Sequence, residues 1–198
     1  MSEKFKLFIT AEDKVKKPPP PPLKIPAKHK GMTFDDMIRT LSEAEKSASL
    51  PTGLLSVMAF LESSGDPTAV AEDGAAKGLL QVTPTFHEQQ NIKDIADIKE
   101  VATKAASYLR HAHDRMGQSL NTQAFEGFGW ELKWELAVMA YHAGVQGVLN
   151  WLGDAAPLTG EHKNVGAKTL KYAERISDYM VHGFNPEIMR PKWDKQGQ

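Results

Sequence analysis

Glu62 is the residue whose type and position best suit acid-base chemistry in this sequence. It follows the apolar stretch from Gly53 to Leu61, which reads GLLSVMAFL and carries no charge. If this stretch is helical, Ala59, Met58 and Leu55 lie three, four and seven places before Glu62 and flank it. A carboxyl group among aliphatic side chains loses hydration of its charged form, which favours the protonated state that a general acid needs. The alternative is an ordinary amphipathic-helix glutamate that reaches solvent.

A loop of small residues follows Glu62 along the chain. It reads DGAAKG from Asp73 to Gly78 and continues into Leu79, Leu80 and Gln81. Glycine allows a ligand to approach the backbone closely, and the Gln81 amide could hydrogen-bond a sugar hydroxyl or an N-acetyl group. Taken alone, a glycine-rich turn of this kind is more often structural.

A third set of polar residues closes a later apolar helix. The segment AYHAG ends in Gly144, a residue that suits the end of a helix, and contains Tyr141 and His142. The apolar face before it includes Trp134 and Val138. Tyr141 is either a site residue or a core aromatic whose hydroxyl reaches the surface.

Apolar residues recur at helical spacing through most of the chain that surrounds these residues. Thr33 is expected to cap a helix containing Phe34 and Leu41, and Pro51 is expected to open a second helix that ends near Glu62. Further helices are predicted near Ile95 to Met116, Trp130 to His142, Val145 to Leu152 and Ala167 to Val181. Strand patterns are nearly absent, apart from a short hairpin predicted near Val70 to Val82. The fold class is therefore mainly α.

The chain divides into an arm, a body and an extension. Residues 1–31 form a basic, proline-rich arm, in which six prolines lie between Pro18 and Pro26. Such a run stiffens into polyproline II and predicts a tether or docking segment, with an SH3-type ligand or a nucleic-acid tail as the alternatives. Residues 32–182 form the predicted α-rich domain, and residues 183–198 form a C-terminal extension.

Composition excludes several kinds of chemistry. The chain has no cysteine, which removes a thiolate nucleophile and every cysteine-based metal site. His111 and His113 are two residues apart on a predicted helix and point in different directions, so we expect no metal and no cofactor. No apolar stretch approaches the ~20 residues of a membrane span. The N-terminus lacks the continuous apolar region of a signal peptide, so we expect no Sec export.

Taken in order, these segments resemble the soluble lytic transglycosylase (SLT) family and its goose-type lysozyme relatives. The resemblance covers about residues 34–180 and rests on several ordered motifs. The matching residues are Leu54-Leu55, Glu62-Ser63, Pro67, Gly78-Leu79-Leu80-Gln81, Pro84, Ala106-Ser107-Tyr108-Leu109, Ala137 to Gly144 and, less clearly, Thr169-Leu170-Lys171-Tyr172.

The resemblance implies a lysozyme-like domain that cleaves the β-1,4 bond between N-acetylmuramic acid and N-acetylglucosamine in peptidoglycan. Glu62 matches the single catalytic acid/base of the family, and the product would be a 1,6-anhydro sugar. Gln81 and Tyr141 match residues that line the sugar site and help to hold the glutamate, and Tyr172 matches a weaker aromatic position. The expected substrate-binding residues are Gly78, Leu80, Gln81, Tyr141, His142 and Tyr172.

Three positions depart from the family pattern. Ala71 stands nine places after Glu62, where the family usually has serine. The loop before Gly78 is one residue longer than usual and contains Glu72 and Asp73, which leaves open a second acid that activates water. His142 replaces the usual asparagine, where a histidine could hydrogen-bond sugar, change the pH profile or simply pack.

The family normally acts outside the cytoplasm, whereas this chain lacks a recognisable export signal. We therefore expect a bacteriophage-encoded, virion-associated protein that acts in the host periplasm and cell wall and opens the wall during genome entry. Its partners would be glycan strands and, through the arm and the C-terminal extension, tail or ejection proteins; no nucleic-acid partner is expected. The alternatives are an inverting muramidase or phage endolysin of the same fold, or a structural or wall-binding virion component with little activity.

Overall fold

The computed structural model describes residues 31–119, 130–153 and 165–195, so the predicted proline-rich arm lies outside the described residues except for Gly31. The described part of the chain is mainly α-helical, as the sequence predicts, and contains no strand. Its elements are α1 (Phe34–Ser47), α2 (Leu54–Ser63), α3 (Pro84–Gln90), α4 (Ile98–Ser119), α6 (Trp130–Ala143), α7 (Val145–Gly153), α8 (Ala167–His182), the 3₁₀ turn η1 (Pro186–Met189) and α9 (Arg190–Lys195).

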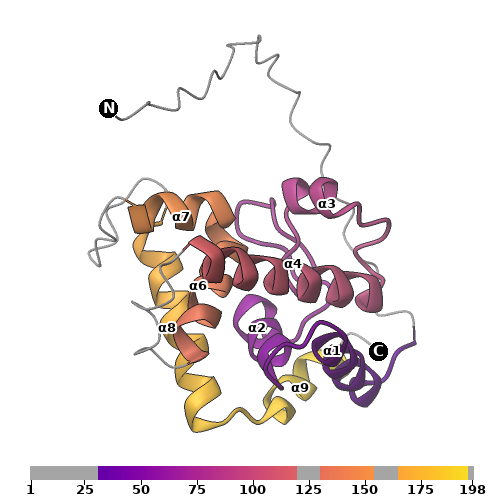
Figure 1. Ribbon diagram of the computed structural model, residues 1–198. Coiled ribbons are helices and arrows are strands. Elements are labelled where there is room, and N and C mark those ends of the chain that lie inside the picture. The colour runs from indigo at the N-terminus through magenta and orange to yellow at the C-terminus, as the bar shows by residue number, and fades with distance from the viewer. Residues whose placement is uncertain (1–30, 120–129, 154–164, 196–198) are drawn as a thin grey trace, which may run out of the picture.

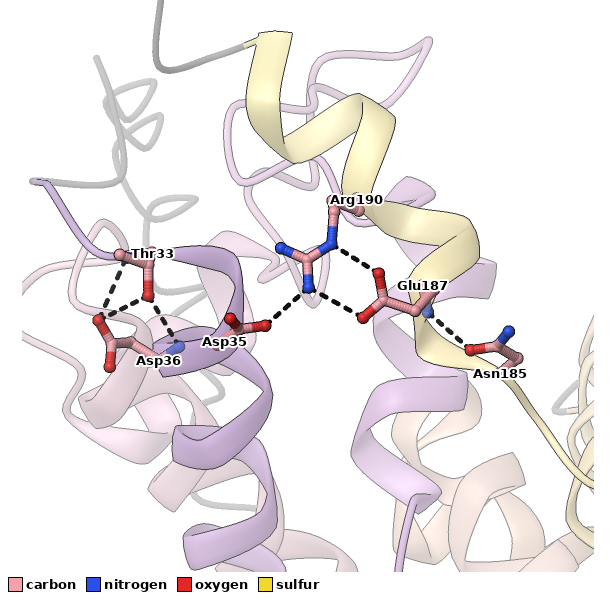
Figure 2. Close-up of polar contacts among 6 residues, drawn as sticks. All are labelled: Thr33, Asp35, Asp36, Asn185, Glu187 and Arg190. Carbon is pink, nitrogen blue, oxygen red and sulfur yellow. Dashed lines mark hydrogen bonds and ion pairs between the residues drawn. The ribbon is translucent and has the colours of Figure 1, made fainter.

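Helix α1 begins where Thr33 caps it. The Thr33 hydroxyl accepts a hydrogen bond from the Asp36 backbone N–H at 3.1 Å and donates to the Asp36 carboxylate at 2.7 Å. The same carboxylate accepts from the Thr33 backbone N–H, which completes a capping box (Figure 2). Phe34 and Leu41 are buried on the inner face of the helix. The predicted start of this helix is confirmed.

Helix α2 lies at the centre of the fold, where it packs against α1, α8 and η1 (Figure 1). Its residues from Leu54 to Ala59 are all buried, because the segment is apolar on nearly every side. The prediction that this helix begins at Pro51 is wrong, since it begins at Leu54. Gly53 precedes it with φ of 90°, a left-handed conformation that interrupts the helix between Pro51 and Leu54.

Glu45 of α1 caps α2 in place of the side chain that Gly53 lacks. Its two carboxylate oxygens accept the backbone N–H groups of Gly53 at 2.8 Å and Leu55 at 2.7 Å. The side chain is buried, and burial raises the pKa of this carboxyl although the backbone donors oppose the shift. An acid at this end also complements the positive end of the helix dipole.

The remaining helices form the wall of the domain around α2. Helix α4 packs against α1 and α6, and α6 packs against α7 and α8. The predicted ends of α6, α7 and α8 are confirmed to within about a residue. Helix α4 begins at Ile98 rather than at Ile95, because Asp94 first forms a turn with Asp97, whose carboxylate accepts the Glu100 N–H.

The loop between α2 and α3 contains the predicted hairpin in a reduced form. Val70 pairs with Lys77, and Lys77 pairs with Val82, as isolated antiparallel bridges. Helix α3 follows at once, with Thr83 as its N-cap and Pro84 in its first turn. No helix was predicted between Glu62 and Ile95, so α3 is an addition to the predicted elements.

The C-terminal segment returns to the domain beside α1 and α2. Met189 and Trp193 are buried in the core. A Cβ added at Gly65, which has φ of +81°, would lie 2.5 Å from Met189 Cβ, so Gly65 is the residue that allows this contact. On the surface, the Arg190 guanidinium bridges Glu187 and Asp35 of α1 (Figure 2). None of the described helices is long and apolar enough to cross a bilayer.

Candidate active site

Glu62 occupies the last turn of α2, where the buried helix meets the loop that follows it. Its side chain is only 12% exposed. One carboxyl oxygen, Oε1, lies 3.1 Å from Nε2 of His142, at the end of α6. The contact joins residues 80 positions apart in the sequence, so two separate elements fix the position of this carboxyl.

The end of α2 is tied to the loop by the residue after Glu62. The Ser63 hydroxyl lies 3.0 Å from the Ala59 carbonyl and 2.9 Å from the Leu79 carbonyl. Ser64 then ends the helix in the left-handed conformation, with φ of 57°. These contacts set the distance between Glu62 and the loop. Ser63 belongs to the motif that resembles the family, but its sequence position did not predict these contacts.

The predicted sugar-binding residue Gln81 uses its amide to shape the loop. Its Nε2 donates to the Gly78 carbonyl at 2.9 Å and to the Ala69 carbonyl at 3.3 Å, and its own backbone is left-handed with φ of 47°. The Gly78 backbone N–H donates to the same Ala69 carbonyl at 2.8 Å. The Leu80 side chain is buried in the core. Gly78, Leu80 and Gln81 thus form one hydrogen-bonded turn beside the end of α2.

Tyr141 connects α6 to this turn. Its hydroxyl donates to the Leu80 carbonyl at 2.9 Å. Its ring packs on Phe86 and Tyr108, with centroids 5.2 and 6.2 Å away, and Tyr108 in turn donates to the Ala140 carbonyl. Burial first, and then the negative charge of Glu62, raise the pKa of Tyr141. Tyr141 is therefore a neutral donor that holds the loop close to Glu62.

Tyr172 of α8 closes the site on its remaining side. Its ring stacks on the His142 imidazole, with centroids 4.0 Å apart and planes inclined by 23°. The Tyr172 hydroxyl is buried and has no hydrogen bond of regular geometry within the described residues. Burial, followed by the charge of Glu62 and a polar contact with it, raises the pKa of Tyr172 well above its ordinary value. The phenol thus places a neutral hydroxyl next to the carboxyl of Glu62.

Four of the residues singled out from the sequence therefore meet at one point. Glu62 comes from α2, Tyr141 and His142 come from α6, and Tyr172 comes from α8. The supporting ring of Phe86 was not predicted, because its contact with Tyr141 depends on helix α3.

The loop acids of the alternative hydrolytic mechanism lie on the surface. Glu72 and Asp73 are exposed, and the Asp73 carboxylate accepts the Ala75 backbone N–H at 2.9 Å within its own turn. Over the ranges that the structure describes, no three His, Asp or Glu side chains gather as a metal site would require. The arrangement offers one enclosed carboxyl whose Oε1 is held by His142, and such a group can donate a proton and recover it.

Comparison with known proteins shows the family of this chain. The family model described as the transglycosylase SLT domain matches residues 39–163, a range that includes Glu62, Tyr141 and His142 but not Tyr172. Among curated proteins, the chain is similar to membrane-bound lytic murein transglycosylase F of Alcanivorax borkumensis, with 31% identity over 83 residues. That match covers 42% of this chain and 17% of the relative, so it concerns a small part of the longer protein. The match to the family model extends over more than half of the chain, and the chain therefore belongs to the transglycosylase SLT domain family.

Proposed function

We propose that this protein is a peptidoglycan lytic transglycosylase in which Glu62 is the catalytic acid and base. The substrate is the glycan strand, and the bond cleaved is the β-1,4 linkage between N-acetylmuramic acid and N-acetylglucosamine. The observation that carries the proposal is the enclosed Glu62 carboxyl, 12% exposed and held 3.1 Å from His142 at the end of α2. The family and the name of the curated relative support the same chemistry.

One carboxyl is enough for this reaction. Protonated Glu62 gives its proton to the leaving glycosidic oxygen while positive charge develops on the muramic acid ring. The ionised carboxylate then takes the proton of the muramic acid C6 hydroxyl as that oxygen attacks the anomeric carbon. The bond to the leaving sugar breaks, the 1,6-anhydro ring forms, and Glu62 is protonated again. Water is not consumed, so no second acid is required to activate it.

The surrounding residues have supporting parts in this mechanism. Tyr172 offers its neutral hydroxyl beside the carboxyl and can hydrogen-bond to Glu62 or to the sugar. Gln81, Gly78 and Leu80 form the backbone turn against which the sugar binds, and Tyr141 holds that turn in place. The Gln81 amide nitrogen is already used within the loop, so its carbonyl oxygen is the group that we assign to the substrate.

A turbidity assay that compares the wild-type protein with its Glu62→Gln variant tests the proposal. Purified wild-type protein and Glu62→Gln are added to outer-membrane-stripped cells, after circular dichroism has established that both are folded. We expect the wild type to clear the suspension and Glu62→Gln to be at least about a hundredfold slower, the order of a lost acid-base group. Equal clearing by both proteins would remove Glu62 from the mechanism. If neither clears, the protein is the weakly active wall-binding component instead.

We further propose that the protein is encoded by a bacteriophage and acts from the virion on the host wall, during genome entry. The basic, proline-rich arm supports this role, because a stiff tether of this composition suits attachment to a larger assembly. The C-terminal segment exposes Ile188 and offers a second attachment surface. Immunoblotting of purified particles tests the idea. Recovery of the chain with the particles is expected, and its confinement to the soluble lysate would indicate an endolysin.

A further inference from the structure

His142 is the titratable group in direct hydrogen-bond contact with the general acid. Its Nε2 lies 3.1 Å from Glu62 Oε1, and its ring is stacked on Tyr172 at 4.0 Å. The imidazole remains 31% exposed, so protons from solvent can reach it, whereas the Glu62 side chain is 12% exposed. An asparagine at this place could form a hydrogen bond, but its charge could not change between pH 5 and 8 as that of an imidazole can.

We propose that His142 is a positioning residue that sets the pH range in which Glu62 works, a conclusion that rests on the function proposed above. A neutral imidazole holds one oxygen of the carboxyl and leaves the other for the substrate. A protonated imidazole at the same distance stabilises the ionised carboxylate, since opposite charges in contact favour both charged forms. Because two ionisable groups at this distance influence each other's protonation, we treat them as one pair.

The coupling has two consequences for the reaction, and they act in opposite directions. At acid pH, where both groups hold a proton, the imidazolium stabilises the carboxylate that forms as Glu62 gives its proton to the leaving oxygen, so the first step is faster. At higher pH the pair loses one proton, and the ion-paired form, with the proton on His142, is favoured over the form with the proton on Glu62. Glu62 then lacks the proton that the leaving group needs, and activity falls earlier than it would beside an asparagine.

The other groups around the pair do not supply this change in charge. Tyr141 of α6 and Tyr172 of α8 both interact with Glu62, and burial raises the pKa of each phenol, so both stay neutral across the working range. Asp66, Glu72, Asp73 and Lys77 are the charged residues of the loop between α2 and α3. Asp66 accepts two hydrogen bonds from Thr68, Glu72 and Asp73 are exposed, and Lys77 is buried. His142 contacts Glu62 at hydrogen-bond distance, and an imidazole is the kind of side chain whose charge changes between pH 5 and 8.

The pH dependence of kcat/KM in the full chain tests this inference. We expect His142→Asn to be slower than wild type at acid pH and to keep its activity to higher pH, with the descending limb moved upward by about one pH unit or more. His142→Phe, which retains a ring against Tyr172, should move the limb in the same direction. His182→Asn is the matched control, because His182 is an exposed histidine on α8, outside the site, and its profile should follow wild type. If the His142 variants lose the same fraction of kcat/KM at every pH, the role of His142 is structural and the inference is overturned.

A second readout is independent of turnover. The imidazole resonance of His142 is followed by NMR during pH titrations of wild type and Glu62→Gln. We expect the midpoint to fall to lower pH in Glu62→Gln, because the neighbouring negative charge has been removed. An unchanged midpoint would contradict the coupling. If Glu62→Gln proves fully active, the proposed function fails; if it is inactive while the profile and midpoint of His142 do not move, only this inference fails.

Discussion

Tyr172 is a residue at which the effects of a substitution on activity and on stability can be separated. Its hydroxyl is buried beside Glu62 without a regular hydrogen bond in the described part of the chain, while its ring stacks on His142. We predict that Tyr172→Phe changes the free energy of unfolding by less than about 1 kcal/mol, because the ring and its packing are kept and little hydrogen bonding is lost. We also predict a fall in kcat/KM of about tenfold, the value of one good hydrogen bond.

The control for this prediction is Tyr172→Leu, which removes the ring as well. It should lower both stability and activity. Urea unfolding and initial rates of glycan cleavage measure the two quantities. If Tyr172→Phe retains full activity, the hydroxyl has no part in the reaction and Tyr172 serves as the ring that supports His142.

At this scale, the sequence predicts residue types better than contacts. Glu62 could be placed on the flank of an apolar stripe from local spacing alone. Its pairing with His142 could not, because the partners lie on α2 and α6, and their approach depends on how both helices pack in the domain. The use of the Gln81 amide within its own loop was also unpredictable, since it depends on the left-handed backbone at that residue.

At the scale of helices, the start of α2 depends on Glu45, which accepts hydrogen bonds from its first backbone N–H groups. We predict that Glu45→Ala lowers the free energy of unfolding by about 1–3 kcal/mol, because the N–H groups of Gly53 and Leu55 would lose their buried acceptor. For a chain of this length, this corresponds to a fall in melting temperature of about 2–4 °C per kcal/mol. Glu43→Ala is the matched control, since Glu43 is exposed on the same helix and its loss should change little. Equal melting temperatures for the two variants would contradict the capping role.

The contact between α4 and α6 contains a partly buried histidine, His113, whose protonation we expect to affect stability. His113 stacks on Trp134 with centroids 4.2 Å apart, and burial lowers the pKa of His113 despite the adjacent Asp114. A histidine with a lowered pKa in the folded state contributes stability above its unfolded value of about 6.5, and that stability is lost as the pH falls. We predict that the melting temperature of wild type falls more steeply between pH 7 and pH 5 than that of His113→Phe.

The exposed neighbour His111 provides the control for this titration. His111→Gln should follow the wild-type dependence, because that side chain is exposed. If the melting temperatures of wild type and His113→Phe depend on pH in the same way, the pKa of His113 does not change on folding and the prediction is wrong.

The C-terminal segment packs against the end of α2 through the buried Met189 side chain, whereas the ion pairs of Arg190 lie on the surface. Met189 is fully buried against Gly65, three residues after Glu62. We predict that Met189→Ala lowers the free energy of unfolding by about 2–5 kcal/mol, as expected for a truncated core side chain. Arg190→Ala should change stability little, because its ion pairs with Asp35 and Glu187 are on the surface (Figure 2). Thermal unfolding compares the two; a larger loss in Arg190→Ala would reverse this ranking.

Helix boundaries could be predicted where a capping residue, proline or glycine was not contradicted by the backbone conformation of a neighbouring residue. The Thr33 cap and the end of α6 at Gly144 were readable from the sequence, and both are present. The start of α2 was misplaced because Pro51 suits a first turn, whereas the left-handed Gly53 ends that turn. Helix α3 was missed although Thr83 and Pro84 are good start signals, because the segment is short and its apolar face is small.

At the scale of the whole molecule, the site depends on more of the chain than the family match covers. The matched range ends at residue 163, yet Tyr172 on α8 interacts with Glu62, and Met189 in η1 packs against Gly65 just after α2. Figure 1 shows α2 at the centre, with α8 and the C-terminal elements beside it. The α-rich fold class was predictable from periodicity, whereas the return of the C-terminal segment onto α1 and α2 was not, because two prolines and few apolar residues suggested only an extension.

Mass spectrometry of muropeptides released in heavy-oxygen water tests the central claim most directly. Purified peptidoglycan is digested with the wild-type protein, and with Glu62→Gln as the control for background cleavage. If Glu62 transfers the proton while the muramic acid C6 hydroxyl attacks, the wild type releases 1,6-anhydro ends that contain no solvent oxygen, and Glu62→Gln releases almost none. Reducing muramic acid ends that carry the heavy isotope would contradict the account and would identify a hydrolase.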